Sequence, residues 1–289
     1  MTLSIPSSLY IVSTGRSGTT VLAKALSGHP ELIMRARFPY ENRSSQHLFT
    51  WGMNGREWDI PYLCADRDTG VKYQLHQRDD EQSKKWFSDN KDLIRKYRAV
   101  DITDKYYEFV ATIEGKTSPK AYVEKSIGVG TIRRMHNWGW PLKKILMIRD
   151  PRDILLSVNS FNRKHNMEGF GADKFDDREL LRRYIAFFVS NRRAIGAKDL
   201  PGLEVKYENL KNNPQLELKR IATELGLDDS DDSISSMVGA YSSVDDQVTA
   251  HRTQKNIDNT IRWPDEATDE QLEMFSEFQE ELSELSYPS

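Results

Sequence analysis

The chain has 289 residues, of which 41 are Lys or Arg and 44 are Asp or Glu, giving a formal net charge of −3. This balance excludes a broad basic surface for nucleic acid, so any anion site must be local, and the single cysteine, Cys64, excludes an internal disulfide framework. Nothing typical of a secretory signal precedes the first apolar run, and no run approaches the ~18 apolar residues of a membrane span, which predicts a cytoplasmic protein.

The stretch from Tyr10 to Leu26 has the pattern of a strand, a glycine loop and a helix. Residues 9–12 are apolar and predict a short buried strand. Gly15 and Gly18 then predict a tight loop, and apolar residues at helical spacing follow it. Backbone N–H groups in such a loop and the N-terminus of the following helix attract an anion. The order therefore predicts a phosphate-binding cradle, with an ordinary glycine turn as the alternative.

The side chains of this loop distinguish it from a nucleotide triphosphatase loop. Arg16, Ser17, Thr19 and Thr20 add donors to the same place. A Walker A loop carries Lys and Ser or Thr directly after its last glycine, for the phosphates and for magnesium. Here the spacing is shorter and no Lys follows Gly18. The loop therefore favours an anion that lacks a triphosphate tail and a magnesium ion.

Residues 31–70 contain many turn formers and aromatic side chains and are expected to be irregular, as a substrate wall or a loose insertion. Glu41 is the carboxylate of interest in this stretch, with a solvated surface role as the alternative. Amphipathic patterning then predicts helices over residues 81–98 and 104–113. We interpret residues 38–120 as an insertion on the substrate side of the domain.

Two further strands are predicted to end in basic residues. Residues 121–123 predict a strand that leads to Lys125, which is either a ligand at the carboxyl end of a sheet or a surface lysine. Residues 144–149 form the clearest buried strand and end in Arg149, with Ser157 two helical turns later. A guanidinium fork with a nearby hydroxyl suits a phosphate monoester.

Asp150 follows the same strand and allows a competing interpretation. An apolar strand that ends in Asp is typical of a Walker B segment, which would indicate a nucleotide-dependent kinase. The rest of the chain continues the alternation of strands and helices, which is the pattern of a doubly wound α/β sheet. The predicted elements are a helix over 178–197, a strand over 202–207, a turn at 208–210, a helix over 214–225, a polar connector over 228–236 and a helix over 268–285.

Taken together, these segments resemble the PAPS-dependent sulfotransferases. STGRSGTT is similar to that family's 5′-phosphosulfate loop, KILMIRDPRDILLSVNSF to its 3′-phosphate segment, and KYENLKNNPQLELKRIATELGL to its strand, turn and helix near the adenine. The tail that follows Arg262 and Trp263 is similar to that of many bacterial members. The resemblance covers roughly residues 8–285. It implies one α/β domain over residues 1–289, with a central parallel sheet related to P-loop kinases and a helical C-terminal part over 228–289.

The resemblance also implies roles for individual residues. Arg16 and Lys125 would act on the leaving group, Arg149 and Ser157 would bind the 3′-phosphate, and Tyr207 would approach the adenine. The full set of expected cofactor contacts is Arg16, Ser17, Gly18, Thr19, Thr20, Arg149, Ser157, Tyr207 and Lys255. No metal is expected.

Two departures from the cytosolic branch of the family indicate the bacterial and tyrosylprotein branches. Cytosolic members usually carry Lys where this chain has Arg16, and they place a catalytic His two residues after a Lys. Here Lys125 is followed by Ser126 and Ile127. In branches with Arg in the loop the base is often a Glu shortly after the first helix, which corresponds to Glu41.

The expected reaction is transfer of the sulfuryl group from PAPS to a hydroxyl, with release of 3′,5′-ADP. Glu41, Arg16 and Lys125 are the expected catalytic residues. The sequence leaves the acceptor open among small-molecule, carbohydrate and lipid hydroxyls, as well as the oligomeric state. A nucleotide-dependent kinase and a non-catalytic relative that binds 3′,5′-ADP are the alternatives, and the first of these would require magnesium and ATP.

Overall fold

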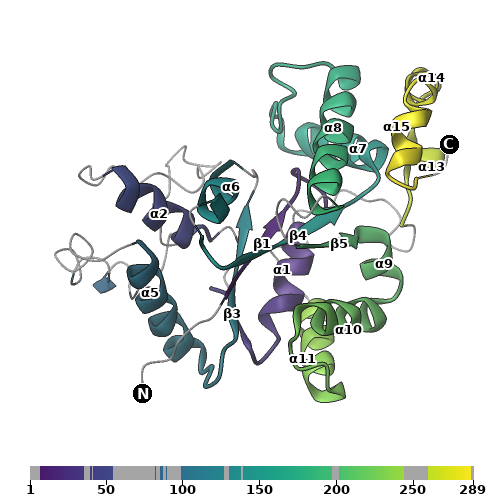
Figure 1. Ribbon diagram of the computed structural model, residues 1–289. Coiled ribbons are helices and arrows are strands. Elements are labelled where there is room, and N and C mark those ends of the chain that lie inside the picture. Colours follow the sequence, from purple (N-terminus) through teal and green to yellow (C-terminus); the bar gives the residue numbers. More distant parts are fainter. Residues whose placement is uncertain are drawn as a thin grey trace.

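Five strands of the described chain form one parallel sheet in the order β2-β3-β1-β4-β5 (Figure 1). The structure is a computed structural model that describes residues 7–35, 40, 42–54, 82, 85–86, 89, 99–126, 130–137, 139–196, 202–243 and 260–287. The strands are β1 (Ser7–Val12), β2 (Leu32–Ile33), β3 (Ala121–Ser126), β4 (Leu142–Ile148) and β5 (Gly202–Lys206). This architecture confirms the predicted α/β fold with a parallel sheet.

Helices cover both faces of the sheet. In chain order they are α1 (Thr19–Ser27), α2 (Ser44–Asn54), α5 (Ala99–Glu114), α6 (Gly130–Asn137), α7 (Pro151–His165), α8 (Asp177–Gly196), α9 (Tyr207–Asn212), α10 (Pro214–Leu225), α11 (Asp231–Ser242), α13 (Trp263–Glu266), α14 (Asp269–Ser276) and α15 (Gln279–Glu284). One face is covered by α1, α10 and α11. The other is covered by α2, α5 and α6 at one end and by α7, α8, α14 and α15 at the other (Figure 1).

Strand β1 shows why the sheet is buried on both sides. Leu9 and Ile11 point to the face covered by α1, whereas Tyr10 and Val12 point to the face covered by α2 and α5. All four side chains are at most 2% exposed. A parallel strand between two helical layers needs such a continuous apolar run, because its alternate side chains enter two different cores.

The register of the strands brings the chemical groups together. Ile11 of β1 pairs with Lys125 of β3, Val12 of β1 pairs with Leu146 of β4, and β4 runs parallel to β5. The carboxyl ends of these strands therefore lie along one edge of the sheet. This edge is where open parallel sheets bind ligands.

The structure differs from the sequence predictions in four segments. Residues 31–70 were expected to be irregular, but β2 and α2 lie within their described part. The first turn of α2 is bonded by β3, since the N–H of Ser45 donates to Oε1 of Glu124 at 2.6 Å. A helix that is capped from a distant strand has no local sequence signal.

The other three differences are smaller. The predicted polar connector over 228–236 is helical from Asp231, where α11 begins with Ser230 as its N-cap. The predicted turn at 208–210 belongs to α9, and the predicted helix over 268–285 is divided into α14 and α15. No glycine or proline marks the division at Glu277 and Phe278. Phe275 and Phe278 are nevertheless both buried against α8, so the division keeps the apolar face of this segment on the core.

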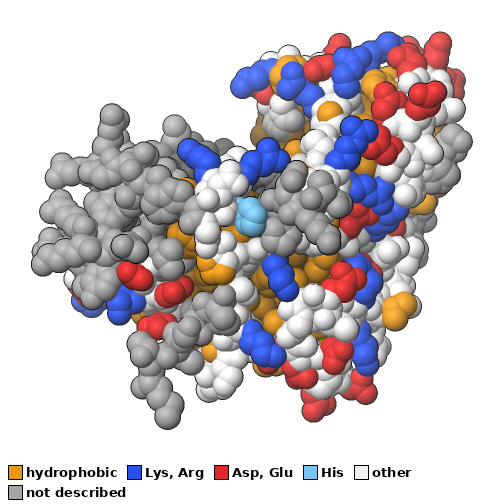
Figure 2. Space-filling view, viewed as in Figure 1, with side chains coloured by type: hydrophobic (Ala, Val, Ile, Leu, Met, Phe, Trp, Pro, Cys, Tyr) orange, Lys and Arg blue, Asp and Glu red, His pale blue; other side chains and the backbone are white. Residues whose placement is uncertain are grey.

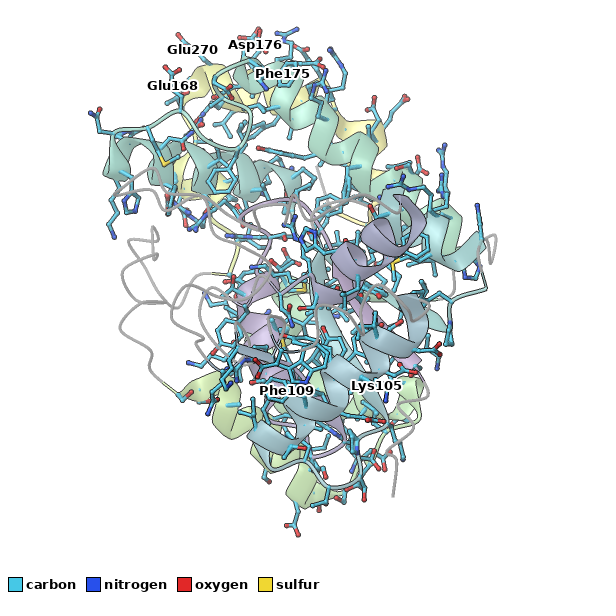
Figure 3. The ribbon with its side chains drawn as sticks, turned by 90° about the vertical axis from the view of Figure 1, so that its left-hand side faces the viewer. Lys105, Phe109, Glu168, Phe175, Asp176 and Glu270 are labelled. Carbon is cyan, nitrogen blue, oxygen red and sulfur yellow. The ribbon has the colours of Figure 1, made fainter. Side chains whose placement is uncertain are left out.

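Charges of both signs are interspersed over the part of the surface that carries α8 and the C-terminal helices (Figure 2). Figure 3 shows Phe175 and Asp176, just before α8, at one end of the molecule, with Lys105 and Phe109 of α5 toward the other.

Among the helices that the structure describes, none is both long and apolar enough to cross a membrane. In the same residues, no group of three or more His, Cys, Asp or Glu side chains is placed to hold a metal ion.

Candidate active site

The loop between β1 and α1, residues 13–18, is a tight turn with two residues in left-handed backbone conformation. These are Arg16, with φ of 65°, and Gly18, with φ of 92°. The hydroxyl of Ser17 donates to the carbonyl of Thr14 at 2.8 Å and closes the turn. Gly18 is the N-cap of α1 and offers no side-chain acceptor, and the first turn of α1 has no acidic residue. The N-terminus of α1 is therefore suited to an anionic ligand.

Both glycines of the loop lie against aromatic rings. A Cβ atom on Gly18 would lie 2.4 Å from Cδ2 of Tyr207, and one on Gly15 would lie 2.4 Å from Cδ1 of Phe170. Glycine is therefore required at these positions for the rings to contact the loop backbone. At Gly18 the positive φ adds a second reason. The sequence predicted the loop, but not the two rings that cover it.

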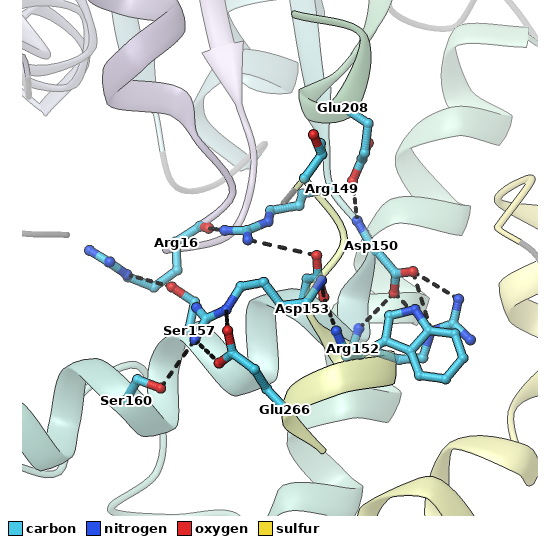
Figure 4. A network of polar contacts seen from close by, with 12 residues as sticks. Arg16, Arg149, Asp150, Arg152, Asp153, Ser157, Ser160, Glu208 and Glu266 are labelled. Carbon is cyan, nitrogen blue, oxygen red and sulfur yellow. Dashed lines mark hydrogen bonds and ion pairs between the residues drawn. The ribbon is translucent and has the colours of Figure 1, made fainter. Parts of the chain in front are cut away.

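Arg16 connects the loop to α7. Its Nε donates to the hydroxyl of Ser157 at 3.2 Å (Figure 4). Its guanidinium carbon lies 4.6 Å from the centre of the Phe161 ring. Its carbonyl oxygen accepts a hydrogen bond from Nη1 of Arg149 at 3.1 Å. The structure thus brings together Arg16, Arg149 and Ser157, with the difference that Ser157 contacts the predicted phosphosulfate loop directly.

Arg149 lies at the carboxyl end of β4 and is only 5% exposed. Its guanidinium carbon lies 4.6 Å from the centre of the Tyr207 ring, and its Nη2 lies 3.8 Å from Oδ2 of Asp153. Within the described part of the chain, Nε and Nη2 have no hydrogen-bond partner. These two nitrogens form one edge of the guanidinium, which can donate two parallel hydrogen bonds to an oxyanion. Buried donors are almost always bonded, so this edge favours an anionic ligand.

Lys125 lies near the end of β3, is 5% exposed, and donates from Nζ to the hydroxyl of Thr20 at 3.0 Å. Thr20 belongs to the first turn of α1, next to Thr19. The ammonium group is therefore held beside the N-terminus of α1. Lys125 is therefore not a surface lysine, which was the alternative interpretation of this residue.

Two predicted site residues, Glu41 and Lys255, lie outside the described residues. The other predicted residues, Arg16, Ser17, Gly18, Thr19, Thr20, Lys125, Arg149, Ser157 and Tyr207, lie at or beside the carboxyl edge of the sheet.

The contacts of Asp150 give it a structural role that differs from the magnesium-binding role of a Walker B aspartate. Its carboxylate accepts hydrogen bonds from the backbone N–H of Arg152 at 2.9 Å and from the Arg152 guanidinium, the shortest at 2.8 Å (Figure 4). The side chain therefore caps α7 and neutralises a buried guanidinium. This structural role weakens the kinase alternative.

Two buried carboxylates beside Arg149, those of Asp153 and Glu208, were not predicted from the sequence. Asp153 is fully buried, and burial raises its pKa to about 6, although Arg149 acts in the opposite direction. Burial also raises the pKa of Glu208, which accepts a hydrogen bond from the N–H of Asp150 at 3.1 Å. Asp153 lies in the first turn of α7, four residues after Arg149, and this short separation in sequence is the signal that was available.

The chain is similar to a known protein family and to solved structures. The sequence model described as the sulfotransferase family matches residues 7–231. The sulfotransferase domain of the Synechococcus PCC 7002 olefin synthase is 17% identical, with a TM-score of 0.56 over 98% of this chain and 95% of that chain. The sulfotransferase domain of the curacin biosynthetic pathway is also 17% identical, with a TM-score of 0.56 over 98% of each chain.

A third similar structure is the mouse sulfotransferase SULT7A1 complexed with PAP. It is 15% identical, with a TM-score of 0.50 over 96% of this chain and 85% of that chain. No curated protein sequence matches the chain. The similar structures show the fold, and the family match extends over most of the chain and includes the loop, Lys125, Arg149 and Tyr207. The chain therefore belongs to the sulfotransferase family.

Proposed function

We propose that this protein transfers the sulfuryl group of PAPS to a hydroxyl acceptor and releases 3′,5′-ADP. The observation that carries the proposal is the edge of Arg149 formed by Nε and Nη2, which has no hydrogen-bond partner among the described residues and lies next to the loop after β1. The carboxylate of Asp153 lies 3.8 Å from Nη2, beyond hydrogen-bond distance, so a nucleotide with a 3′-phosphate would supply the acceptors that both nitrogens need. The PAP complex of the similar mouse enzyme supports the choice of nucleotide.

The 3′-phosphate would be held by Arg149 and Ser157. The guanidinium would donate from Nε and Nη2, while Nη1 stays bonded to the carbonyl of Arg16. The hydroxyl of Ser157 accepts from Nε of Arg16, and a hydroxyl that accepts one hydrogen bond can also donate one. The ring of Tyr207, in contact with both Gly18 and Arg149, would lie against the adenosine.

The 5′-phosphosulfate would lie at the N-terminus of α1, with Ser17, Gly18, Thr19 and Thr20 as its contacts. PAPS supplies a sulfuryl group on a bisphosphate leaving group, whose bridging oxygen gains negative charge as its bond to sulfur breaks. Arg16 and Lys125 would stabilise that charge, because fixed cations contribute most where charge develops in the transition state. The hydrogen bond between Lys125 and Thr20 supports this assignment, since it holds the ammonium beside α1.

Glu41 would accept the proton that the acceptor hydroxyl loses as its oxygen bonds to sulfur. A single general base of this kind typically contributes ~10²- to 10⁴-fold to the rate. Lys255 would be a further nucleotide contact. The acceptor is a hydroxyl of a small molecule, a carbohydrate or a lipid.

The experiment that tests the function uses PAPS labelled in its sulfuryl group. The protein is incubated with this PAPS and an extract of the source organism, in the presence of a metal chelator, and labelled products are identified. We expect a labelled sulfate ester that depends on the protein and is absent with Lys125→Ala. A parallel incubation contains ATP labelled in its γ-phosphate, with magnesium and no chelator. Transfer of label in that incubation, with no transfer from PAPS, would instead support a kinase.

A further inference from the structure

Asp153 connects Arg149 to the C-terminal part of the chain. Its Oδ1 accepts hydrogen bonds from the backbone N–H groups of Arg262 at 3.0 Å and Trp263 at 2.9 Å (Figure 4). Its Oδ2 has no hydrogen-bond partner in the described residues and lies 3.8 Å from Nη2 of Arg149. One carboxylate therefore links α7, the strand end that carries Arg149, and the start of α13.

A second connection reaches the other side of Arg149. Glu208 directly follows Tyr207, and its Oε1 accepts from the N–H of Asp150 at 3.1 Å. Its Oε2 accepts from the hydroxyl of Tyr287 at 3.0 Å. Residues 260–287, which we call the C-terminal segment, are thus bonded directly to Asp153 and are linked through Glu208 to the residue after Arg149.

The contact at Asp153 is itself held rigidly. Arg262 is 1% exposed and donates from Nε to Glu266 at 3.0 Å, and the Arg152 guanidinium carbon lies 3.9 Å from the centre of the Trp263 ring. The two N–H groups that bind Asp153 therefore belong to an anchored turn. Since Oδ1 is fixed by both of them, the direction of Oδ2 toward Arg149 is fixed as well.

We infer that Asp153 is a positioning residue for the nucleotide, through which the C-terminal segment holds Arg149 in the orientation that binds the 3′-phosphate. The inference rests on the proposed function. The family match ends at residue 231, so the C-terminal segment lies beyond the residues that the match covers. The inference gives this segment a part in nucleotide binding without a direct contact to the ligand.

Asp153 can affect 3′,5′-ADP binding through its negative charge or by orienting Arg149, and these two roles predict opposite effects when its carboxylate is removed. The charged groups that face Asp153 are Arg149 and the carboxylate of Asp150. A carboxylate beside an anion site repels the anion, so if charge alone mattered, a neutral residue would tighten binding. Asparagine would still accept from the two N–H groups, but its amide nitrogen would face Nη2 of Arg149, donor against donor. If Asp153 acts by orienting Arg149, Asp153→Asn weakens the binding of 3′,5′-ADP.

The first test compares Asp153→Asn with Asp177→Asn by calorimetry. Asp177 is a matched control, because its Oδ2 also joins α14 to α7, through Gln271 at 3.3 Å and Asn159 at 2.9 Å. We expect Asp153→Asn to weaken 3′,5′-ADP binding by about tenfold, the scale of one charge-assisted hydrogen bond from Arg149 to the 3′-phosphate. The affinity for 5′-AMP should not change. Asp177→Asn should leave the affinity for both nucleotides within about twofold, the range of surface substitutions.

The second test needs no substitution and measures hydrogen exchange at the amides of Arg262 and Trp263. If detachment of the C-terminal segment disables the 3′-phosphate site, binding and attachment are linked reciprocally. At a 3′,5′-ADP concentration of 100 Kd, exchange through detachment should slow by up to ~100-fold. The same multiple of Kd for 5′-AMP should have a much smaller effect.

Failure of the inference and failure of the proposed function give different results. The inference alone would be overturned if the two nucleotides slowed exchange equally. It would also be overturned if Asp153→Asn bound 3′,5′-ADP at least as tightly as the unaltered chain does. An unaltered chain that does not bind 3′,5′-ADP would overturn the proposed function, and the inference with it.

Discussion

The carbonyl oxygen of Arg16 accepts a hydrogen bond from Nη1 of Arg149 at 3.1 Å, although 133 residues separate the two in sequence. This contact joins the loop after β1 to the end of β4. It also occupies one side of the Arg149 guanidinium and leaves the Nε and Nη2 edge for a ligand.

Arg149→Lys should lose most of the preference for 3′,5′-ADP over 5′-AMP. Lysine keeps the charge but cannot donate two parallel hydrogen bonds from a planar fork. The expected loss is roughly 2 to 3 kcal/mol, or about 30- to 150-fold in Kd for 3′,5′-ADP. Arg193→Lys is the control, since Arg193 makes a two-point contact with Glu284 at the surface, at 2.8 and 2.9 Å. Equal affinities in the Arg149 variant and the unaltered chain, by calorimetry, would contradict the assignment.

Lys125→Ala should lower kcat far more than it weakens nucleotide binding. The charge that Lys125 stabilises is largest in the transition state, so its removal costs little in the ground state. Arg16→Ala should behave in the same way. Lys120→Ala provides a control, because Lys120 is half exposed and pairs with Glu31 at 2.8 Å. Steady-state kinetics at saturating PAPS decide the matter, and normal turnover in Lys125→Ala would remove this residue from the mechanism.

Glu41→Gln should retain PAPS binding and lower the rate by ~10²-fold or more, as expected for the loss of a general base. His47→Ala is the informative comparison. Burial and the neighbouring Arg43 lower the pKa of His47 to about 4, which makes its imidazole a weak base at neutral pH. We therefore expect His47→Ala to remain active. An active Glu41→Gln enzyme together with an inactive His47→Ala or His76→Ala enzyme would transfer the role to a histidine.

The free energy of unfolding should carry a pH dependence from Asp153. Its folded-state pKa is raised from 3.8 to about 6, so between these values the folded state binds more protons than the unfolded state. Stability from this group is therefore present at low pH and is lost as the pH rises from about 4 to about 6, by on the order of 3 kcal/mol. Urea unfolding of the unaltered chain and Asp153→Asn at several pH values measures it. A difference between the two that does not change with pH would contradict the shift.

The chain pattern was sufficient to predict the parallel sheet, and it indicated residues that the structure places at or beside the carboxyl edge of that sheet. Buried strands were recognised from short apolar runs, and Arg149 from its place after the clearest of them. The role of Lys125 was harder to predict, because the sequence around it is equally consistent with a surface lysine. Its contact with Thr20 depends on the pairing of β3 with β1, which joins residues far apart in sequence.

The features that sequence reasoning missed are tertiary contacts. The start of α2 is bonded by Glu124 of β3, and Tyr207 lies on Gly18 because β5 ends next to the loop. Asp153 owes its orientation to two backbone N–H groups of residues 262 and 263. Backbone donors carry no residue-type signal, so no motif could have indicated this connection.

The most direct test of the central claim is the binding of 3′,5′-ADP and 5′-AMP to the unaltered chain, measured by calorimetry with a metal chelator present. A bidentate 3′-phosphate contact at Arg149 predicts that 3′,5′-ADP binds at least about 30-fold more tightly, without metal. Equal affinities for the two nucleotides would contradict the account, because the open edge of Arg149 would then have no 3′-phosphate to bind.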